Sequence, residues 1–114
     1  MASFKELVVW QKGVDLTVCA YAIAKQLPAS ERYGLSSQIT RAAGSIPSNI
    51  AEGHRRNNKP EYRHFCAIAL GSAAELETQL IIIERVYPDV DLGVAMVLNI
   101  EVQKMLTALV AKLS

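Results

Sequence analysis

Basic side chains are concentrated in one short stretch of the chain. Arg55, Arg56 and Lys59 fall close together, and Arg63 follows about one helical turn later. Lysine and arginine at this density attract phosphate groups, and neutralising phosphates releases counterions from nucleic acid. Arg41, upstream of this stretch, is a further candidate. We therefore predict that these residues contact RNA or DNA through backbone charge and shape, because no base-reading motif accompanies them.

A solvated protein surface is the alternative interpretation of this stretch. Glu52 and Glu61 fall within it and reduce its positive charge. The formal net charge of the whole chain is only +1, so an electrostatic function has to be local. Several copies of the cluster in one assembly would raise the potential and engage many phosphates at once. Affinity would then come from avidity and not from a single site.

Catalysis is the second class of function considered. His64 lies one helical turn from Glu61, close enough to pair, and His54 lies near Glu52. No nucleophile, metal-ligand spacing or phosphate-binding loop accompanies them. The two cysteines, Cys19 and Cys66, lie in apolar stretches that predict small buried side chains and not a disulfide or a metal site. We therefore expect no enzymatic activity, no cofactor and no bound metal.

Apolar residues at helical spacing predict the first two elements that must position these side chains. The first helix runs over residues 7–27 and ends at Pro28. The second runs from about residue 33 to residue 52, and Gly53 is expected to stop it, because glycine is common just past a helix C-terminus. The basic stretch would then lie in the loop that follows.

Two more helices complete the chain. Asn58 is expected to cap the third, with Pro60 in its first turn and Glu61 completing a capping box. The fourth follows Asp91 and runs to the C-terminus. Short connections favour antiparallel neighbours, so we predict an all-α, up-down-up-down four-helix bundle that forms a single domain over residues 1–114.

Pro47 stands inside the pattern of the second helix. It cannot donate to the carbonyl of Ala43, and its usual cost in a helix interior is about 3 kcal/mol. A kinked but continuous helix is the simplest interpretation, with Gly44 giving backbone freedom and serine hydroxyls bonding to freed carbonyls. The same helix carries a polar stripe that is either its wet side or a surface for packing and assembly; it contains Arg41, Ser45, Ser48 and Glu52, with Asn49 at its edge.

The chain has more apolar side chains than one small core needs. Hydrophobic residues make up 51% of it. The third helix carries apolar residues outside its main seam, namely Phe65, Ile68, Leu70, Ala74 and Ile81. A helix that faces one core needs an apolar stripe of only about 100°, so this excess predicts an interface between copies of the chain. Without a long uninterrupted apolar run or the features of a signal peptide, we expect a cytoplasmic protein that does not enter a membrane.

Three segments of the sequence are distinctive together: FKELVVWQKGVDL, ERYGLSSQITRAAGSIPSNIAEGHRR and HFCAIALGSAAELETQL. In this order they resemble the small proteins encoded in intervening sequences of bacterial 23S ribosomal RNA genes. More distantly, the chain resembles the accessory variability determinant protein of diversity-generating retroelements, from the same superfamily. The resemblance implies a four-helix bundle that assembles as a ring-shaped homopentamer, with a proposed role in nucleic-acid binding.

The motif of this family in the second helix can be carried over by position. Besides Arg41, it falls on Ser45, Ile46, Pro47, Asn49, Ile50, Ala51, Glu52 and Gly53. Members of the family often have a second basic residue where this chain has Thr40. Two functions are therefore kept: a homo-oligomeric ring that binds RNA or DNA, and an assembly module that docks a nucleic-acid enzyme such as a reverse transcriptase.

Overall fold

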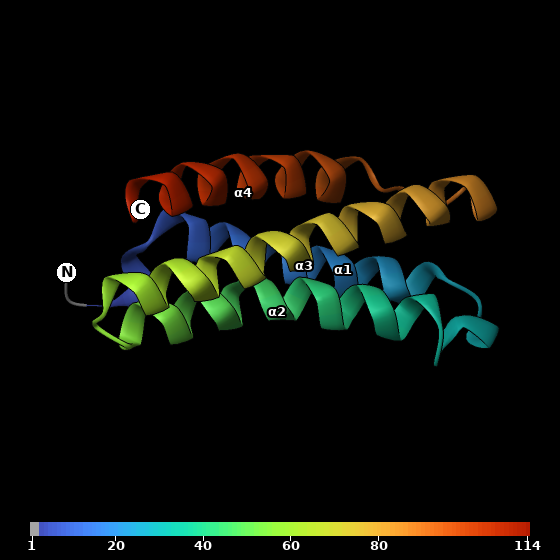
Figure 1. The fold of residues 1–114 in the computed structure, drawn as a ribbon. Coiled ribbons are helices and arrows are strands. Elements are labelled where there is room, and N and C mark those ends of the chain that lie inside the picture. The colour runs from blue at the N-terminus through green and yellow to red at the C-terminus, as the bar shows by residue number, and fades with distance from the viewer. Residues whose placement is uncertain (1–2) are drawn as a thin grey trace.

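The structure, a computed structural model, describes residues 3–114 and is built from four long α-helices (Figure 1). No strand occurs within the described residues. The helices are α1 (Val8–Gln26), α2 (Leu35–Arg55), α3 (Lys59–Val86) and α4 (Gly93–Lys112), with short 3-10 helices η1 (Phe4–Glu6) and η2 (Ala29–Glu31). This confirms the prediction of an all-α four-helix bundle.

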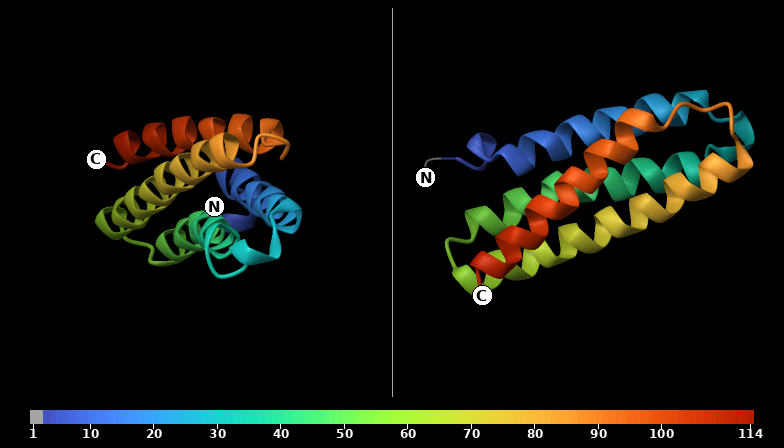
Figure 2. Two further views of the ribbon diagram at one scale, coloured as in Figure 1. Left: turned by 90° about the vertical axis from the view of Figure 1, so that its right-hand side faces the viewer. Right: turned by 90° about the horizontal axis from the view of Figure 1, so that it is seen from above.

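Consecutive helices run in opposite directions along a molecule of 43 × 20 × 19 Å. α2 packs between α1 and α3, while α4 lies on α1 and α3 on the side away from α2 (Figure 1). Figure 2 shows α4 running obliquely across these two helices. η1, the end of α4 and the α2–α3 turn therefore gather at one end of the bundle, and η2 and the α3–α4 connection lie at the other.

The core follows the predicted helical spacing. The seam of α3 is confirmed, because Cys66, Ala69, Ala73, Leu76, Leu80 and Ile83 are all buried. In α1 the side that carries Leu16, Ala20 and Ile23 faces the core. Its second apolar side, with Val18 and Tyr21, remains exposed to solvent.

Gly53 does not end α2, contrary to the expectation from the sequence. The helix continues through it to Arg55, and Gly53 is buried where α2 meets α3. A Cβ atom at this position would lie 2.7 Å from Cβ of Phe65 and 3.2 Å from Cδ1 of Tyr62. The chain turns at Asn57 instead, whose φ of 53° lies in the left-handed region that asparagine tolerates. Gly53 therefore sets the close approach of two helices, and Asn57 makes the turn.

Pro47 lies inside α2, and the helix continues through it as predicted. The carbonyl of Ala43 lacks its usual donor, because proline has no N–H. Thr17 of α1 supplies a partial replacement: its hydroxyl lies 3.1 Å from the carbonyl oxygen of Ala43 and shares its one hydrogen between this oxygen and the carbonyl oxygen of Gly13, 2.8 Å away in its own helix. The expected relief by Ser45 and Ser48 is therefore wrong, since the donor comes from the neighbouring helix.

The ring of Pro47 also decides how closely α1 can approach. Pro47 is buried, and a Cβ atom on Gly13 of α1 would lie 3.4 Å from both Cβ and Cδ of the ring. Gly13 is buried as well. Glycine thus allows α1 to pack directly against the proline, in the same place where Thr17 reaches Ala43.

α3 and α4 each contain an 18-residue window that is long and apolar enough to cross a membrane, by length and composition alone. Buried core helices of soluble proteins have the same composition, and 39% of the window in α3 is buried within the bundle. Only 22% of the window in α4 is buried. α4 is therefore the less covered of these two helices.

Glu31, the last residue of η2, links the start of α2 to the end of α3. Its Oε2 accepts a hydrogen bond from the hydroxyl of Tyr87 at 2.5 Å, and its Oε1 accepts one from the backbone N–H of Leu35 at 3.2 Å. These bonds favour the carboxylate, so they lower the pKa of Glu31, the hydroxyl of Tyr87 having the larger effect.

A pH titration will reveal this link. Because the pKa of Glu31 is lowered in the folded state, its contribution to stability is present above the pKa of an unfolded glutamate and disappears as the pH falls through the lower folded value. We expect Tyr87→Phe to move the pKa of Glu31 back up toward the ordinary value and to reduce this acid sensitivity. Carboxyl ¹³C NMR measures the pKa directly. An unchanged pKa in the variant would contradict the assignment of Tyr87 as the main cause.

Candidate nucleic-acid interface

The turn between α2 and α3 carries most of the predicted phosphate-binding residues (Figure 1). Arg56 caps the end of α2, Asn57 reverses the chain and Asn58 caps α3. Asn58 Oδ1 accepts a hydrogen bond from the backbone N–H of Glu61 at 3.0 Å, which confirms the predicted N-cap. Pro60 occupies the first turn of α3, where its missing N–H has no intrahelical partner to lose. The basic stretch is therefore fixed at one end of the bundle by well-capped helices.

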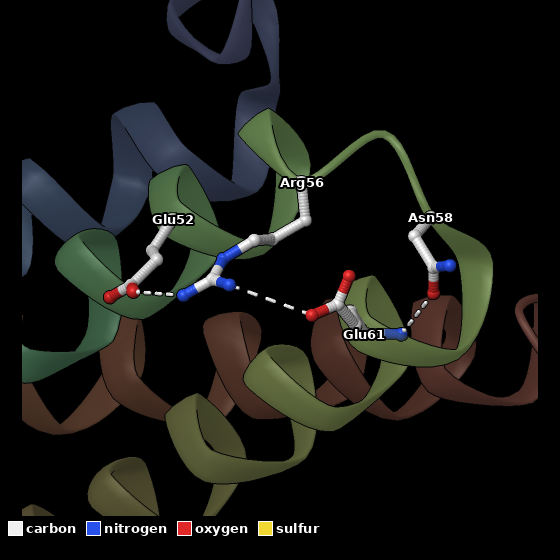
Figure 3. Close-up of polar contacts among 4 residues, drawn as sticks. All are labelled: Glu52, Arg56, Asn58 and Glu61. Atoms are coloured by element: carbon white, nitrogen blue, oxygen red, sulfur yellow. Dashed lines mark hydrogen bonds and ion pairs between the residues drawn. The ribbon is translucent and has the colours of Figure 1, made fainter.

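Arg56 is held by carboxylates on both sides of this turn (Figure 3). Its Nη2 lies 2.9 Å from Glu52 Oε2, and its Nη1 lies 3.5 Å from Glu61 Oε1. The guanidinium also lies over the ring of Phe65, 5.1 Å from its centroid. The hydrogen bond from Arg56 to Glu52 raises the pKa of the arginine. Arg56 thus ties α2 to α3, and Glu61 uses its carboxylate for this ion pair and not for the second half of the expected capping box.

Three neighbouring cations remain uncompensated. Arg55, Lys59 and Arg63 are exposed, and none has an ion-pair partner within residues 3–114. Arg63 Nε donates a hydrogen bond to the hydroxyl of Ser114 at 3.0 Å, which fixes it beside the end of α4. These three residues, together with the paired Arg56, form the part of the predicted cluster that the fold brings together.

Lys112 is an addition to this cluster that we did not predict from the sequence. It is the last residue of α4 and lies two residues before Ser114, the partner of Arg63. Figure 1 shows the end of α4 beside the α2–α3 turn. Lys112 lies at this end only because α4 is antiparallel to α3. Since that topology was itself predicted, combining it with the position of Lys112 in the sequence would have placed this residue in the cluster.

Arg41 lies apart from the cluster. It is 14 residues before Arg55 on the same helix, and with a rise of about 1.5 Å per residue this places it about 21 Å away along the axis. It lines a polar groove between α2 and α3, together with Gln38, Ala42, Ser45, Glu75 and Gln79. Within one subunit, Arg41 is therefore too far from the turn residues to contact the same few phosphates of a nucleic acid.

The motif residues of α2 serve packing. Ile46 and Ile50 are fully buried in the core. Ser45 Oγ lies 2.8 Å from Ser72 Oγ on α3, and Asn49 Nδ2 donates to the carbonyl oxygen of Ser45 at 2.7 Å. Together with buried Pro47 and Gly53 and the ion-paired Glu52, they hold α2 against both of its neighbours; Ala51 is half-buried in the same helix. The polar stripe is thus in part a helix-packing surface, which was one of the two interpretations.

The side chains considered for catalysis do not form a reactive group. His54 packs edge-on against Tyr62 with ring centroids 5.6 Å apart, and the carboxylate of Glu61 faces Arg56 and not His64. Within residues 3–114, no cluster of three or more histidine, cysteine or acidic side chains could hold a metal ion. Burial raises the pKa of Cys66 to about 11, so its thiol stays protonated and unreactive at neutral pH.

Comparison with known proteins gives a family and structural relatives. The family model described as 23S rRNA-intervening sequence protein matches residues 5–108. The fold is similar to a crystal structure described as a protein with unknown function from the S23 ribosomal protein family, from Bacteroides thetaiotaomicron VPI-5482. The TM-score is 0.81 and the sequence identity 25%, over 90% of this chain and 98% of that chain. A search of curated proteins found no match.

Proposed function

Because the chain belongs to the 23S rRNA-intervening sequence protein family, we propose that it is a non-enzymatic, homo-oligomeric helical bundle that binds the phosphate backbone of RNA or DNA. The proposed assembly is a ring of five copies. The binding surface is the end of the bundle formed by the α2–α3 turn and the end of α4. Its central residues are Arg55, Lys59 and Arg63, with Lys112 beside them.

The observation that carries this proposal is the uncompensated charge at that end. Arg55, Lys59 and Arg63 are exposed and have no ion-pair partner within the part of the chain that the structure describes. Arg56, in contrast, is already balanced by two carboxylates and acts as a support for the turn. Three cations in one subunit give weak attraction, but a cyclic assembly turns the same end of every subunit toward the same side and multiplies that attraction.

A pair of double variants tests the binding surface. We expect Arg55→Ala with Lys59→Ala to weaken binding to RNA and DNA oligonucleotides at low salt, while the mass of the oligomer stays unchanged. The slope of log K against log salt should fall by about 1 for each phosphate contact removed. Fluorescence anisotropy at several salt concentrations measures both quantities.

The matched control is Arg85→Ala with Lys104→Ala, which removes two exposed cations: Arg85 lies in the last turn of α3 at the opposite end of the bundle, and Lys104 lies eight residues, about 12 Å, before Lys112 on α4. We expect it to bind like the wild type. Equal affinities and equal salt slopes for the two double variants would refute the proposed surface. Failure of the wild type to bind either nucleic acid at low salt would refute the proposed function as a whole.

A further inference from the structure

Two apolar surfaces remain outside the core. The first, called here the α1–α2 groove, is lined by Val14, Thr17, Val18, Tyr21, Gly44, Pro47 and Ser48. The second, called the α4 ridge, consists of Val94, Val97 and Ile100 on the outer side of α4. Val97 is 71% exposed and Val18 is 64% exposed. Single exposed valines are ordinary, but apolar residues at helical spacing on two neighbouring turns indicate contact surfaces.

The groove and the ridge lie on different sides of the bundle. α2 forms one wall of the groove, and α4 lies on the side of the molecule away from α2 (Figure 2). Both surfaces nevertheless lie at a similar height along the bundle axis, because Val94 at the start of α4 lies beside Cys19 and Ala22 of α1. One copy can therefore use both surfaces at once, each toward a different neighbour.

The shapes of the two surfaces are complementary. The lining of the groove includes Gly44, which has no side chain and so lets another helix approach closely beside the ring of Pro47. The ridge offers β-branched side chains, which are rigid and lose little rotamer freedom when covered. A convex apolar helix surface thus has a concave apolar counterpart on the same chain.

Charges at the η2 end are complementary as well. Beyond Tyr21 the groove continues to Lys25, Arg32 and Tyr33, with the guanidinium of Arg32 5.4 Å from the centroid of the Tyr33 ring. The ridge is preceded by the exposed Asp89 and Asp91. Lys25, Arg32, Asp89 and Asp91 have no ion-pair partner within residues 3–114. Opposite charges therefore flank the two apolar surfaces at the same end of the molecule.

We propose that the α4 ridge of one copy docks into the α1–α2 groove of the next copy. This inference rests on the self-assembly in the proposed function and names the two faces that make it. Because the two faces differ, the contact is heterologous and leads to a closed ring when the rotation between copies closes. All α2–α3 turns then lie on one side of the ring, which gathers Arg55, Lys59 and Arg63 of every copy there.

A second copy fits the ridge better than a lipid surface does. Helices that lie in membrane interfaces carry lysine and arginine beside their apolar side, which attract anionic lipids. The ridge is preceded by Asp89 and Asp91, whereas Glu101, which follows it on α4, is paired with Lys12 of α1. Asp89 and Asp91 repel anionic lipids but match the cations beside the groove.

Two charge-insertion variants test the proposal by light scattering coupled to gel filtration. Val97→Glu disables the ridge and Val18→Glu disables the groove; both positions are exposed, so the monomer should fold, as circular dichroism will verify. We expect each variant to fall to the monomer mass of 12.5 kDa. The control Ala67→Glu, at an exposed position of α3 outside both faces, should keep the wild-type mass.

Mixing the two variants gives the sharpest result. The ridge of the Val18→Glu chain and the groove of the Val97→Glu chain are both intact, so we expect a one-to-one heterodimer of twice 12.5 kDa and nothing larger. Wild-type mass in both variants would overturn the assigned faces while leaving self-assembly in place. Loss of assembly in only one variant would indicate an isologous contact, in which the same face is used by both copies. This result would also overturn the ridge–groove contact.

Measurements on the wild type show whether the ridge binds a second copy, a lipid surface or neither. A wild-type mass of 12.5 kDa at working concentration would refute the self-assembly of the proposed function, and the ridge–groove contact with it. A monomer that co-floats with phosphatidylglycerol vesicles, and loses this property in Val97→Glu, would show that the ridge binds lipid. Either result overturns the inference, and the two are told apart by the vesicle measurement.

Discussion

Replacing Gly53 with alanine will destabilise the bundle, although alanine is the better helix former. A Cβ atom at this position would lie 2.7 Å from Cβ of Phe65, 3.2 Å from Cδ1 of Tyr62 and 3.3 Å from the backbone oxygen of Tyr62. The Cβ of Phe65 cannot rotate away, because it is fixed to the backbone of α3. The two helices must therefore separate, and overpacking of this kind costs about 1–3 kcal/mol.

Gly71→Ala is the matched control. Gly71 lies within α3 and is exposed, and an added Cβ there meets nothing within 4 Å. Alanine should stabilise the helix at this position by about 0.5–1 kcal/mol. Urea unfolding of both variants at one protein concentration measures the difference. Equal changes in the free energy of unfolding would mean that Gly53 is an ordinary helical glycine and that the close contact with α3 is unimportant.

The same substitution should also affect the end of the bundle that carries the basic residues. Phe65 lies under the guanidinium of Arg56, which spans from Glu52 on α2 to Glu61 on α3. Separation of α2 from α3 at Gly53 would stretch this link. We therefore expect the turn to become less ordered in Gly53→Ala.

Local signals in the sequence determined most of the fold. The cap at Asn58 and the strict helical spacing of α3 involve residues close together in the chain, so they could be predicted without the tertiary structure. The end of α2 was misplaced because a glycine after an apolar periodic run usually marks a helix end. What holds Gly53 is its contact with Phe65, twelve residues later, and a helix-by-helix analysis does not include such contacts.

The candidate site could be predicted only where it is local. Arg55, Lys59 and Arg63 surround one turn, so their proximity follows from the sequence. The ion pairs of Arg56 depend on the geometry of the turn and could not be predicted. The distance to Arg41 could have been calculated from the rise of a helix, which would have separated it from the cluster at the outset.

The second large effect concerns the hydroxyl of Thr17, which bonds to the carbonyl oxygen that Pro47 leaves without a backbone donor. Thr17→Val keeps the size of the side chain but removes the hydroxyl that bonds to the carbonyl oxygens of both Ala43 and Gly13. Ala43 is fully buried, so water cannot replace this donor. A buried carbonyl without a partner costs about 1–3 kcal/mol, and we expect a loss of stability of this order. Thr107→Val is the control, because the hydroxyl of Thr107 is exposed and bonds only to the carbonyl of Gln103 in its own helix, at 2.8 Å. It should change the stability by less than about 0.5 kcal/mol.

A double-mutant cycle with Pro47→Ala connects this loss to the proline. Alanine at position 47 restores an N–H that can bond to Ala43 within α2, so the carbonyl no longer depends on α1. Thr17→Val should then cost less in the Pro47→Ala background than in the wild type, with a coupling of about 0.5 kcal/mol or more. Urea unfolding of the four proteins gives this coupling. Equal costs in the two backgrounds would show that the hydroxyl of Thr17 does not compensate for the N–H that Pro47 lacks.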